Sequence, residues 1–529
     1  MRQWMVAAKK ADFYAIAEKF HVDPVVARII RNREVIGEKN IRIYLGGNLS
    51  DLSDPHQMKD MDRLVEILAQ KIRKQVHIRI IGDYDVDGVT SSHLFLTALR
   101  RVGAKVDVVI PHRIQDGYGL SLHLLQQAKE DGVDTILTCD NGIAAIDEIA
   151  WAKAQKMTVL VTDHHAVPFE EHEGRRTEKK SLADAVVNPH QQDCGYPYKE
   201  LCGAGVAWNV IRVLYENYDM DKREAEDLLD FVAMATVCDV MSLTGENRIL
   251  VKEGLKRIRH TKNIGLQALM QACNVQPENI SAYHFGYVLG PCVNATGRLD
   301  TARHALRLFE TGQETEAEEI ARDLVDLNQE RKELTLQGVE MAKKLCEEGG
   351  YENDPVLVLF LPDVHESIAG LIAGRIREMY NRPVFVLTRG EEGVKGSGRS
   401  TENYSMYENM CGCVELFTKF GGHPMAAGLS LPEENVEKFR RKINENCPLT
   451  VEEVCPDIHI DMAMPVGYAS TELVHQFALL EPFGKDNPSP LFADRNLSIS
   501  RMWLIGKNRN VLRMSVLSEY GQPVPVIFF

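Results

Sequence analysis

The fold is decided by the stretch HIRIIGDYDVDGVTSSHLFL, residues 77–96. Its first five residues are largely apolar and β-branched, which predicts a buried strand. Three aspartates follow within five positions, at Asp83, Asp85 and Asp87, before a helical pattern begins. Like charges at the end of a buried strand destabilise a fold through repulsion and desolvation unless a partner offsets them. The stretch therefore predicts a strand–helix unit and raises the question of what that partner is.

The same strand–helix alternation continues through residues 76–190. Short β-rich runs that alternate with helical segments are the signature of βαβ units, and hence of a parallel sheet with helices on its faces. We therefore assign the chain to the α/β class. The strand candidates are HIRII (77–81), VDVVIP (106–111), DTILTCD (134–140), TVLVTDHH (158–165) and DAVVNPH (184–190).

The flanking regions have different patterns. Residues 1–74 and 201–265 have apolar residues at helical spacing, and residues 303–348 read as one long charged helix that suits a connector between domains. A second, smaller α/β unit begins near residue 354, and the chain becomes β-rich again from about residue 450. We expect domains at residues 1–74, 75–265, 266–350, 351–448 and 449–529.

Composition restricts the class of protein. The chain has 529 residues and 44% hydrophobic content, which is ordinary for a globular protein of several domains. No apolar run reaches membrane-spanning length, and Lys9, Lys10 and Asp12 stand where a signal peptide has its apolar centre, so we expect a cytoplasmic protein. Eleven cysteines without a Cys-x-x-Cys pair argue against a disulfide framework and a structural zinc site.

The net charge of −15 is the reverse of the basic character that nucleic-acid-binding proteins usually show. Carboxylates concentrated at a metal site and on remote helices can nevertheless coexist with a local basic groove. A polyanionic partner must therefore be argued from individual sites.

Polar residues follow the ends of several predicted strands. In open parallel sheets, ligands bind beyond the carboxyl ends of the strands, which meet at one edge. A further candidate, Asp239, ends the apolar helical run FVAMATVCDVMSL (231–243). The strand-end groups are the aspartates of GDYDVDG (82–88), Asp140-Asn141-Gly142, Asp163-His164-His165 and Asn188-Pro189-His190.

These strand-end residues predict a metal centre. A single aspartate after a strand is usually a turn former or a helix cap. Several carboxylates that converge on one edge repel one another unless cations are bound. Carboxylates with neutral imidazole suit Mn²⁺ or Mg²⁺, and their number exceeds what one ion needs. Two ions, typically about 3.5–4 Å apart, clamp a phosphate and lower the pKa of a water between them, so the pattern predicts a two-metal phosphoesterase.

The motifs DYDVDG (83–88), DNG (140–142) and DHH (163–165), with the later Asp239, resemble the four motifs of the DHH phosphoesterase superfamily. Further segments resemble its RecJ branch of single-strand-specific exonucleases. This resemblance covers most of the chain from about residue 40 and is weaker beyond about residue 430. The segments are RIQDGYGL (113–120), CGAGVAW (202–208), GPCVNATGRLD (290–300) and FGGHPMAAGLSL (420–431).

The resemblance implies a ligand set and two catalytic residues. Asp87 and Asp140 are implied to contact both ions or lie between them. Asp163 is expected to orient His164, and His165 to face the phosphate or the leaving oxygen, unless His165 is merely structural. Many relatives have a histidine where this chain has Ile81, so the coordination of the first ion departs from the family pattern here. The implied metal ligands are Asp83, Asp85, Asp87, Asp140, His164 and Asp239.

The resemblance also implies a DHH-associated domain that binds substrate, and an OB-like domain that binds single strands. A lone arginine is usually a solvated charge, a lone GGH is usually a turn, and a tyrosine is commonly core, so these assignments rest mainly on the resemblance. The implied substrate-binding residues are Arg113, Tyr118, Arg298, His365, Ser397, Arg399, Ser400, Gly421, Gly422 and His423.

The C-terminal region leaves two interpretations open. Its aromatic residues are either core or base-stacking platforms. The last strand candidate runs to the final residue, so we expect the OB-like domain to be cut or its remainder to be missing. The aromatics concerned are Phe483, Phe492, Trp503, Phe528 and Phe529.

The implied function is 5′→3′ exonuclease action on single-stranded DNA in repair and recombination, with two Mn²⁺ or Mg²⁺ ions per site. A monomer is expected, with a helicase and a single-strand-binding protein as partners. There is no G-x-S-x-G nucleophile, and GEEGVKGSGRS (390–400) lacks the spacing of a nucleotide-binding P-loop. One alternative is a nanoRNase or cyclic-dinucleotide phosphodiesterase, but those chains are shorter. The other is a non-catalytic nucleic-acid-binding scaffold, which should lack the metal ligands that this chain retains.

Overall fold

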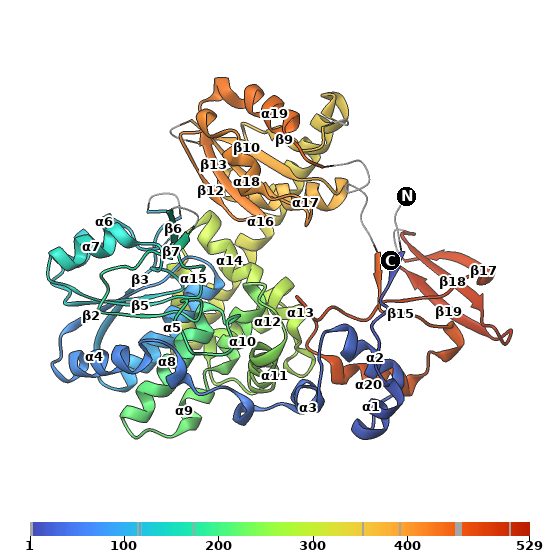
Figure 1. Ribbon diagram of the computed structural model, residues 1–529, viewed down its shortest axis with the longest axis horizontal. Coiled ribbons are helices and arrows are strands. Elements are labelled where there is room, and N and C mark those ends of the chain that lie inside the picture. The colour runs from blue at the N-terminus through green and yellow to red at the C-terminus, as the bar shows by residue number, and fades with distance from the viewer. Residues whose placement is uncertain are drawn as a thin grey trace. The chain divides into compact units, whose positions relative to one another are not determined.

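The computed structural model describes residues 4–113, 116–117, 119–172, 175–351, 354–390, 393–449, 458–506 and 509–529. The chain separates into two compact units (Figure 1). The larger unit comprises Val6–Gly297, Thr301–Leu324 and His459–Phe529, and the smaller unit comprises Arg298–Asp300 and Val325–Ile458 with the first residues of the chain.

A five-stranded parallel sheet forms the centre of the larger unit. Its order is β3-β2-β4-β5-β8, and every neighbouring pair is parallel, as the sequence predicts. All five residues of β4 are buried, as expected for a central strand of a parallel sheet that is covered on both faces. The strands are β2 (His77–Ile81), β3 (Lys105–Val109), β4 (Thr135–Cys139), β5 (Thr158–Thr162) and β8 (Ala185–Val187).

Helices cover both faces of this sheet (Figure 1). On one face, α6 (Leu122–Glu130) and α7 (Ile146–Ala154) pack their apolar residues against β2, β4 and β5. On the other face lie α4 (Met61–Arg73), α5 (Val86–Arg101) and α8 (Gly203–Asn217). The α5 helix is buried over most of its length, because it lies between the sheet and further helices.

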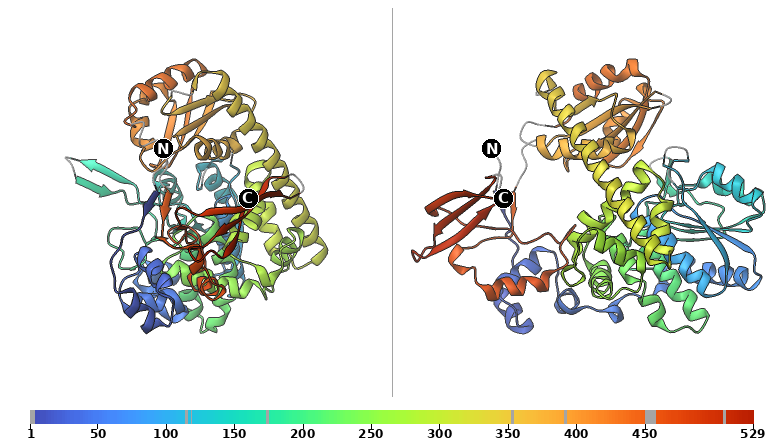
Figure 2. Two further views of the ribbon diagram at one scale, coloured as in Figure 1. Left: turned by 90° about the vertical axis from the view of Figure 1, so that its right-hand side faces the viewer. Right: turned by 180° about the vertical axis from the view of Figure 1, so that it is seen from behind.

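A β-hairpin that we did not predict is inserted between β5 and β8. It consists of β6 (Phe169–His172) and β7 (Arg175–Glu178), and Figure 2 shows it as a narrow ribbon that projects from the sheet domain. Its strands read FEEH and RRTE, which have no apolar face. A sequence without an alternating apolar pattern is not recognised as a strand, because such a strand is stabilised mainly by its cross-strand pairs.

The region after β8 is mostly helical, as predicted for residues 201–265. The helices α10 and α11 pack against each other, and α10 also packs on α5. A short π-helix interrupts the last part of this region. The elements after α8 are α9 (Lys222–Glu226), α10 (Leu229–Cys238), α11 (Gly245–Ile258), α12 (Ile264–Ala272), α13 (Ala282–His284), the π-helix (Phe285–Leu289), α14 (Gly290–Leu299) and α15 (Arg303–Glu310).

The long connecting helix is shorter than predicted. We expected one helix over residues 303–348, but α15 ends at Glu310 and α16 (Glu314–Glu348) begins after a break. At the break, the backbone N–H of Gln313 donates to the hydroxyl of Thr311 at 3.2 Å. Arg307 also forms a two-pronged ion pair with Glu316 across the break. These local bonds stabilise the break between the two helices, which the continuous charged pattern of the sequence does not reveal.

Segments from both ends of the chain share one core. Apolar residues of α1 (Phe13–Phe20), α2 (Pro24–Asn32) and α3 (Glu38–Gly46) pack with Leu473 of α20 (Thr471–Phe477). The guanidinium of buried Arg248 then donates to three carbonyl oxygens, those of Tyr44, Leu479 and Leu480. This single side chain therefore ties α11 to both chain ends.

A three-stranded antiparallel meander ends the chain. It consists of β17 (Ser498–Ile505), β18 (Val511–Leu517) and β19 (Pro523–Phe528), in sequence order. Of the aromatics discussed above, Phe483 and Phe492 pack against the shared core. Trp503, Phe528 and Phe529 are exposed. The described remainder of this region carries the short strands β14 (Ile458–Ile460), β15 (Met462–Ala463) and β16 (Phe492–Ala493).

The smaller unit is built on a mixed sheet of order β12-β13-β11-β10-β9. The pair β9–β10 is parallel and the other pairs are antiparallel. Residues of α16 and α17 pack on one face, and residues of α18 and α19 on the other. The elements are β9 (Leu357–Phe360), α17 (Ala369–Tyr380), β10 (Val384–Gly390), β11 (Gly393–Arg399), α18 (Met406–Cys411), β12 (Lys419–Gly422), β13 (Ala426–Leu431) and α19 (Val436–Glu445).

Among the helices that the structure describes, none is long and apolar enough to cross a membrane.

Candidate metal centre and phosphate-binding residues

The predicted acidic residues converge at the carboxyl edge of the parallel sheet. Because β4 lies between β2 and β5, the loops that follow these three strands are neighbours. Asp239 joins them from the end of α10. In each of three overlapping groups, the candidate ligand atoms lie within 4.8 Å of one another. The groups are Asp83, Asp85 and Asp140; Asp87, His164 and Asp239; and Asp140, His164 and His165.

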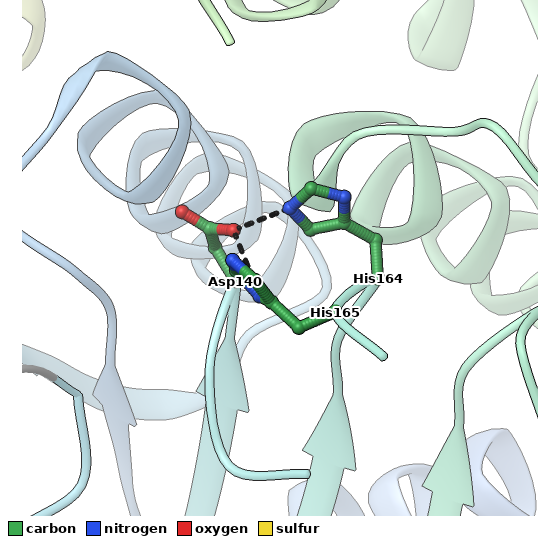
Figure 3. Close-up of side chains that lie close together, drawn as sticks. All are labelled: Asp140, His164 and His165. Carbon is green, nitrogen blue, oxygen red and sulfur yellow. Dashed lines mark ion pairs between the residues drawn. The ribbon is translucent and has the colours of Figure 1, made fainter. Parts of the chain in front are cut away.

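Asp140 and His164 occupy the centre of this cluster. His164 Nε2 lies 3.0 Å from Asp140 Oδ1 and 3.6 Å from a carboxylate oxygen of both Asp87 and Asp239. Figure 3 shows Asp140 facing the rings of both His164 and His165, with His165 Nδ1 4.0 Å from Asp140 Oδ1. One imidazole nitrogen among three carboxylates is an arrangement that a metal ion would bridge.

The backbone at Asp140 has an unusual conformation. Its φ is 61°, in the left-handed region that few residues other than glycine, asparagine and aspartate adopt. Gly203, at the start of α8, leaves room for it, since a Cβ there would lie 2.6 Å from the Cβ of Asp140. The glycine is therefore required by the close approach of α8 to the metal centre.

The N-terminus of α8 also holds Asp87. The backbone N–H groups of Gly203 and Ala204 donate to the two carboxylate oxygens of Asp87 at 2.6 and 2.7 Å. Exposed N–H groups and the helix dipole at a helix N-terminus stabilise a carboxylate in its charged form. We singled out CGAGVAW (202–208) as family-like without assigning it a role. The signal that sequence reasoning missed is a run of small residues opening a helix.

Asp163 positions the histidine loop. Its carboxylate accepts from the backbone N–H groups of His164 and His165 and from that of Ile143. It also accepts from His165 Nδ1 at 2.7 Å. We expected Asp163 to orient His164, and its contact with that residue is to the backbone N–H, whereas the ring that it holds is that of His165. His164 is positioned through its backbone.

The turn after β2 leads directly into α5. Asp85 is the N-cap of α5 and accepts from the N–H of Gly88, while Asp87 already lies within the first turn of the helix. The two side chains accordingly belong to different candidate ligand groups. Gly88 lies inside α5, where a Cβ would be 2.5 Å from the backbone of Asp83. The missing Cβ of Gly88 therefore lets the backbone of Asp83 pack closely on the helix.

The NATGR segment supports the same turn from α14. The side-chain oxygen of Asn294 accepts from the backbone N–H of Val86 at 3.2 Å. Gly297 lies against the carbonyl oxygen of Tyr84, where a Cβ would collide with it. These contacts give two residues of the segment a role that spacing in the sequence does not reveal.

Burial and crowding shift the pKa values of the acidic residues. Burial raises the pKa of Asp83, Asp140 and Asp239 well above the usual value for an aspartate, and the neighbouring carboxylates raise it further. The pKa of Asp87 is also raised, again chiefly by burial, although His164 and the α8 N–H groups oppose this. Such carboxylates become stable in their charged form when cations bind beside them.

The two histidines are shifted in opposite directions. Burial lowers the pKa of His164, which keeps its imidazole in the neutral form that metals bind. Burial would also lower the pKa of His165, but the hydrogen bond and charge of Asp163 raise it to about 9. His165 is therefore suited to donating a proton, and His164 to coordination.

The donor set fits divalent cations that prefer oxygen and imidazole ligands. Asp83 Oδ2 and His164 Nε2 are buried and make no hydrogen bond within the part of the chain that the structure describes. Buried polar atoms in native proteins normally have a partner, and a coordinated ion would supply it. The other four ligand candidates surround the same space. Ile81 is fully buried in the sheet and contributes no donor atom.

Arg113, one of the two predicted substrate-binding residues of the larger unit, lies close to the metal-centre loop. Its guanidinium lies over the ring of Tyr84, 4.5 Å from the ring centroid. Arg113 is thereby tied to the DYDVDG turn. Tyr118 lies outside the described residues.

Four predicted residues of the smaller unit gather around the start of α17. Arg298 Nη1 donates to the carbonyl oxygen of Ser367 at 2.8 Å, and His365 Nδ1 lies 2.6 Å from the Ser367 hydroxyl. Arg399 Nη1 donates to the hydroxyl of Ser397 at 3.2 Å. A Cβ on Gly370 would lie within 2.8 Å of Arg399 and Ser397. We call Arg298, His365, Ser397 and Arg399 the α17 cluster.

Ser400 does not belong to this cluster. Its side chain is buried, and its hydroxyl donates to the carbonyl oxygen of Tyr404 at 2.5 Å. We predicted that Ser400 binds phosphate, and the structure corrects this, because the hydroxyl closes a turn instead. Gly421 and Gly422 lie on edge strand β12, and exposed His423 follows. A Cβ on Gly422 would lie 2.5 Å from the carbonyl oxygen of Ala426, which requires glycine there.

Comparisons with known proteins identify the family. The family descriptions that match are the DHH family N-terminal domain over residues 77–236, the DHHA1 domain over residues 353–447 and the RecJ OB domain over residues 460–529. The single-stranded-DNA-specific exonuclease RecJ of Haemophilus influenzae is 34% identical over 518 residues, which cover 94% of this chain and 88% of that protein. The chain belongs to the RecJ family. The RecJ exonuclease of Bacillus subtilis is 33% identical over 96% of this chain, which spans only 63% of that longer relative.

Solved RecJ structures share the fold. The structure of Thermus thermophilus RecJ in complex with Mn²⁺ matches with a TM-score of 0.82 at 26% identity, over 99% of this chain and 78% of that one. A second structure, of exonuclease RecJ bound to manganese, matches with a TM-score of 0.64 at 31% identity, over 75% of this chain and 96% of that one. The predicted fold class, with DHH, DHH-associated and OB domains, is confirmed.

Proposed function

We propose that this RecJ-family chain is a metal-dependent exonuclease that hydrolyses phosphodiester bonds of single-stranded DNA from the 5′ end. The observation that carries the proposal is the set of overlapping ligand groups centred on Asp140 and His164. They contain more buried carboxylates than one cation requires. RecJ relatives bear the name of single-stranded-DNA-specific exonucleases, and RecJ structures have been solved with Mn²⁺ and with Mg²⁺.

The protein side of the mechanism follows from the positions of these groups. We assign Asp83, Asp85 and Asp140 to one ion, and Asp87, His164 and Asp239, with Asp140 adjacent, to a second. When bound, the two ions would neutralise phosphate charge and lower the pKa of the attacking water. The α8 N–H groups keep Asp87 in place, and Gly203 lets Asp140 approach. The ligand geometry is therefore set by rigid elements before substrate arrives.

His165 is assigned to the substrate side of the centre. It is charged near neutral pH because Asp163 raises its pKa to about 9, and its Nδ1 is held by that carboxylate. The remaining ring nitrogen, Nε2, is then the donor for a phosphate oxygen or the leaving oxygen. Asp163 acts through His165 and does not touch substrate in this assignment.

Phosphate binding is assigned to donors in both units. Arg113 serves in the larger unit, and the α17 cluster with Gly421, Gly422 and His423 serves in the smaller unit. Arginine and serine donors suit phosphate oxygens, and glycines let the backbone approach them. We place the catalytic domain at residues 75–265, the connector at 266–350, the substrate-binding domain at 351–448 and the OB-like domain at 449–529, after the helical segment 1–74.

The setting proposed for this activity is DNA repair and recombination in the cytoplasm. Partners of a nuclease that accepts only single strands would be a helicase that generates them and a single-strand-binding protein that covers them. A monomeric enzyme is proposed.

The test is nuclease assay on end-labelled DNA in Mn²⁺. The enzyme should release mononucleotides from 5′-labelled single strands and leave a blunt duplex intact. Asp140→Asn keeps the left-handed backbone, which asparagine tolerates, and removes the ligand charge, so it should abolish the release. Normal activity of Asp140→Asn or of His164→Ala would overturn the site assignment. Faster cleavage of di- and trinucleotides than of long strands would instead favour a nanoRNase.

A further inference from the structure

Two tyrosines form an exposed stacked pair on the larger unit. Tyr283 is 61% exposed and Tyr287 is 72% exposed. Their ring centroids are 5.1 Å apart and their planes differ by 25°. By contrast, the stacked rings of Phe477 and Phe492 pack against an apolar core. The tyrosine pair thus presents aromatic faces to solvent without contributing its full apolar area to the fold.

The backbone beneath the pair is unusual. Tyr283 lies in α13 and Tyr287 in the π-helix, which leads directly into α14. Single-turn π-helical segments are rare and occur frequently at functional sites. On the opposite side of the same turns, Phe285 and Leu289 are fully buried. The exposed rings are therefore mounted on an anchored segment.

That anchor connects the tyrosine pair to the metal centre. The thiol of Cys238 donates to the carbonyl oxygen of Phe285 at 3.3 Å. Gly290 ends the π-helix against the same thiol, where a Cβ would collide with it. Asp239, a proposed metal ligand, is the next residue along the chain from Cys238. The segment that carries the tyrosines thus packs on the backbone that delivers a ligand.

We propose that Tyr283 and Tyr287 form a base-stacking site for the single strand beyond the nucleotide that is cleaved. This inference rests on the proposed function. Stacking on aromatic rings accepts any base, because every base has a π-face. It also requires unpaired bases, since bases within a duplex already stack on their neighbours. The pair would therefore strengthen binding of long single strands without reading their sequence.

The test compares two double variants on strands of increasing length. Tyr283→Ala with Tyr287→Ala removes both rings, whereas Tyr283→Phe with Tyr287→Phe keeps them. The alanine variant should raise KM for a 30-nucleotide single strand at least about fivefold, since stacking contributes roughly 1–3 kcal/mol per base. Its kcat and its KM for a dinucleotide should match those of the wild type. The phenylalanine variant should match the wild type on every strand.

A matched control is Tyr14→Ala, because Tyr14 lies in α1 and is 79% exposed. It should leave KM for the long strand unchanged. An unchanged KM in the alanine double variant would overturn the proposal. An equal rise in KM for the dinucleotide would also overturn it, since that result would mean that the substitutions distort the metal centre through Cys238 and Asp239.

Binding measured without hydrolysis separates this proposal from the proposed function. The Kd for a labelled single strand can be measured by fluorescence anisotropy in the presence of a chelator. The Kd of the alanine double variant should be at least about fivefold higher than that of the wild type. A strand with the same backbone but without bases should bind both proteins equally. A difference that persists on the abasic strand would contradict stacking. Failure of the wild type to cleave single strands would overturn only the nuclease assignment.

Discussion

The metal centre of the larger unit and the α17 cluster of the smaller unit arrange their polar groups in opposite ways. At the metal centre, like charges are buried together, and Asp83 Oδ2 and His164 Nε2 have no hydrogen-bond partner within the described part of the chain. In the α17 cluster, arginines donate to carbonyl and hydroxyl oxygens, and His365 pairs with Ser367. The first arrangement needs a cation to offset its like charges. The second is internally hydrogen-bonded, and we propose that it exchanges some of these bonds for a phosphate.

The two sites also differ in how rigidly their polar groups are held. The ligands of the metal centre are fixed by backbone N–H groups and by close glycine contacts, such as those of Gly203. The α17 cluster is held by the ends of flexible side chains. A substitution that adds one methyl group should therefore impair activity severely at the metal centre and only mildly at the α17 cluster.

The largest effect is expected from a matched pair of glycine substitutions. Gly203→Ala places a Cβ 2.6 Å from the Cβ of Asp140, which cannot move without its strand. We expect kcat to fall more than about 100-fold, beyond the loss typical of residues that only support a ligand. Gly370→Ala meets only the ends of Arg399 and Ser397, so KM should rise a few-fold with kcat unchanged. Equal losses of kcat in the two variants would contradict the proposed difference in rigidity between the two sites.

The next effect is the dependence of stability on pH and metal. The folded-state pKa values of Asp83, Asp140 and Asp239 are raised, so their contribution to stability is present at low pH and is lost as pH rises through those values. Protein stripped of metal should therefore lose stability as pH rises above about 4, the ordinary pKa of an aspartate. Mn²⁺ at 100 times its Kd should restore about 2.7 kcal/mol. At a fixed Mn²⁺ concentration the stabilisation should grow as pH rises, because the carboxylates bind metal in their deprotonated form. Thermal unfolding that shows the opposite pH trend would contradict this.

A smaller effect is expected at Asp163. Asp163→Asn keeps the shape of the side chain but removes the charge that holds His165 in its protonated form. We expect a loss of kcat of roughly 10- to 100-fold, the effect of losing a supporting residue. The alkaline limb of the pH–rate profile should also shift to lower pH, because the pKa of His165 falls. A profile identical to that of the wild type would exclude the assigned role of His165.

The smallest effect is expected at the α17 cluster, where two neighbouring residues provide test and control. Arg399→Ala removes a proposed phosphate donor, so KM for single-stranded DNA should rise about 5- to 20-fold, roughly the 1.5–3 kcal/mol of a charged hydrogen bond reduced by solvent. Ser400→Ala removes only a buried hydrogen bond to Tyr404 and should lower stability by about 1 kcal/mol without changing KM. A rise in KM for Ser400→Ala but not for Arg399→Ala would show that Ser400, and not Arg399, binds the substrate.

The catalytic half of the fold could be predicted well from the sequence because its signals are local. Buried parallel strands are continuous apolar runs, and their carboxyl ends meet at one edge, so residue order alone places Asp83, Asp140 and His164 together. The hairpin β6–β7 was missed because its strands have no apolar face. The break between α15 and α16 was missed because the charged pattern continues through it.

The support of the site could not be predicted, because it depends on contacts between distant segments. Nothing in CGAGVAW shows that its helix N-terminus faces Asp87, 116 positions earlier in the chain. The loop geometry decides that Asp163 holds the ring of His165 and not that of His164. Ser400 was assigned to phosphate by its position in GSGRS, and only burial reveals its bond to Tyr404. Residue types indicate the chemistry, while tertiary contacts decide which atom performs it.

We propose that the buried carboxylates form a two-ion site. The most direct test of this proposal is the stoichiometry of Mn²⁺ binding, measured by isothermal titration calorimetry near neutral pH in buffers of different ionisation enthalpy. We predict two ions per chain, protons released on binding, and loss of at least one ion in Asp140→Asn. A single ion in the wild type, or two ions bound unchanged by Asp140→Asn, would contradict the account.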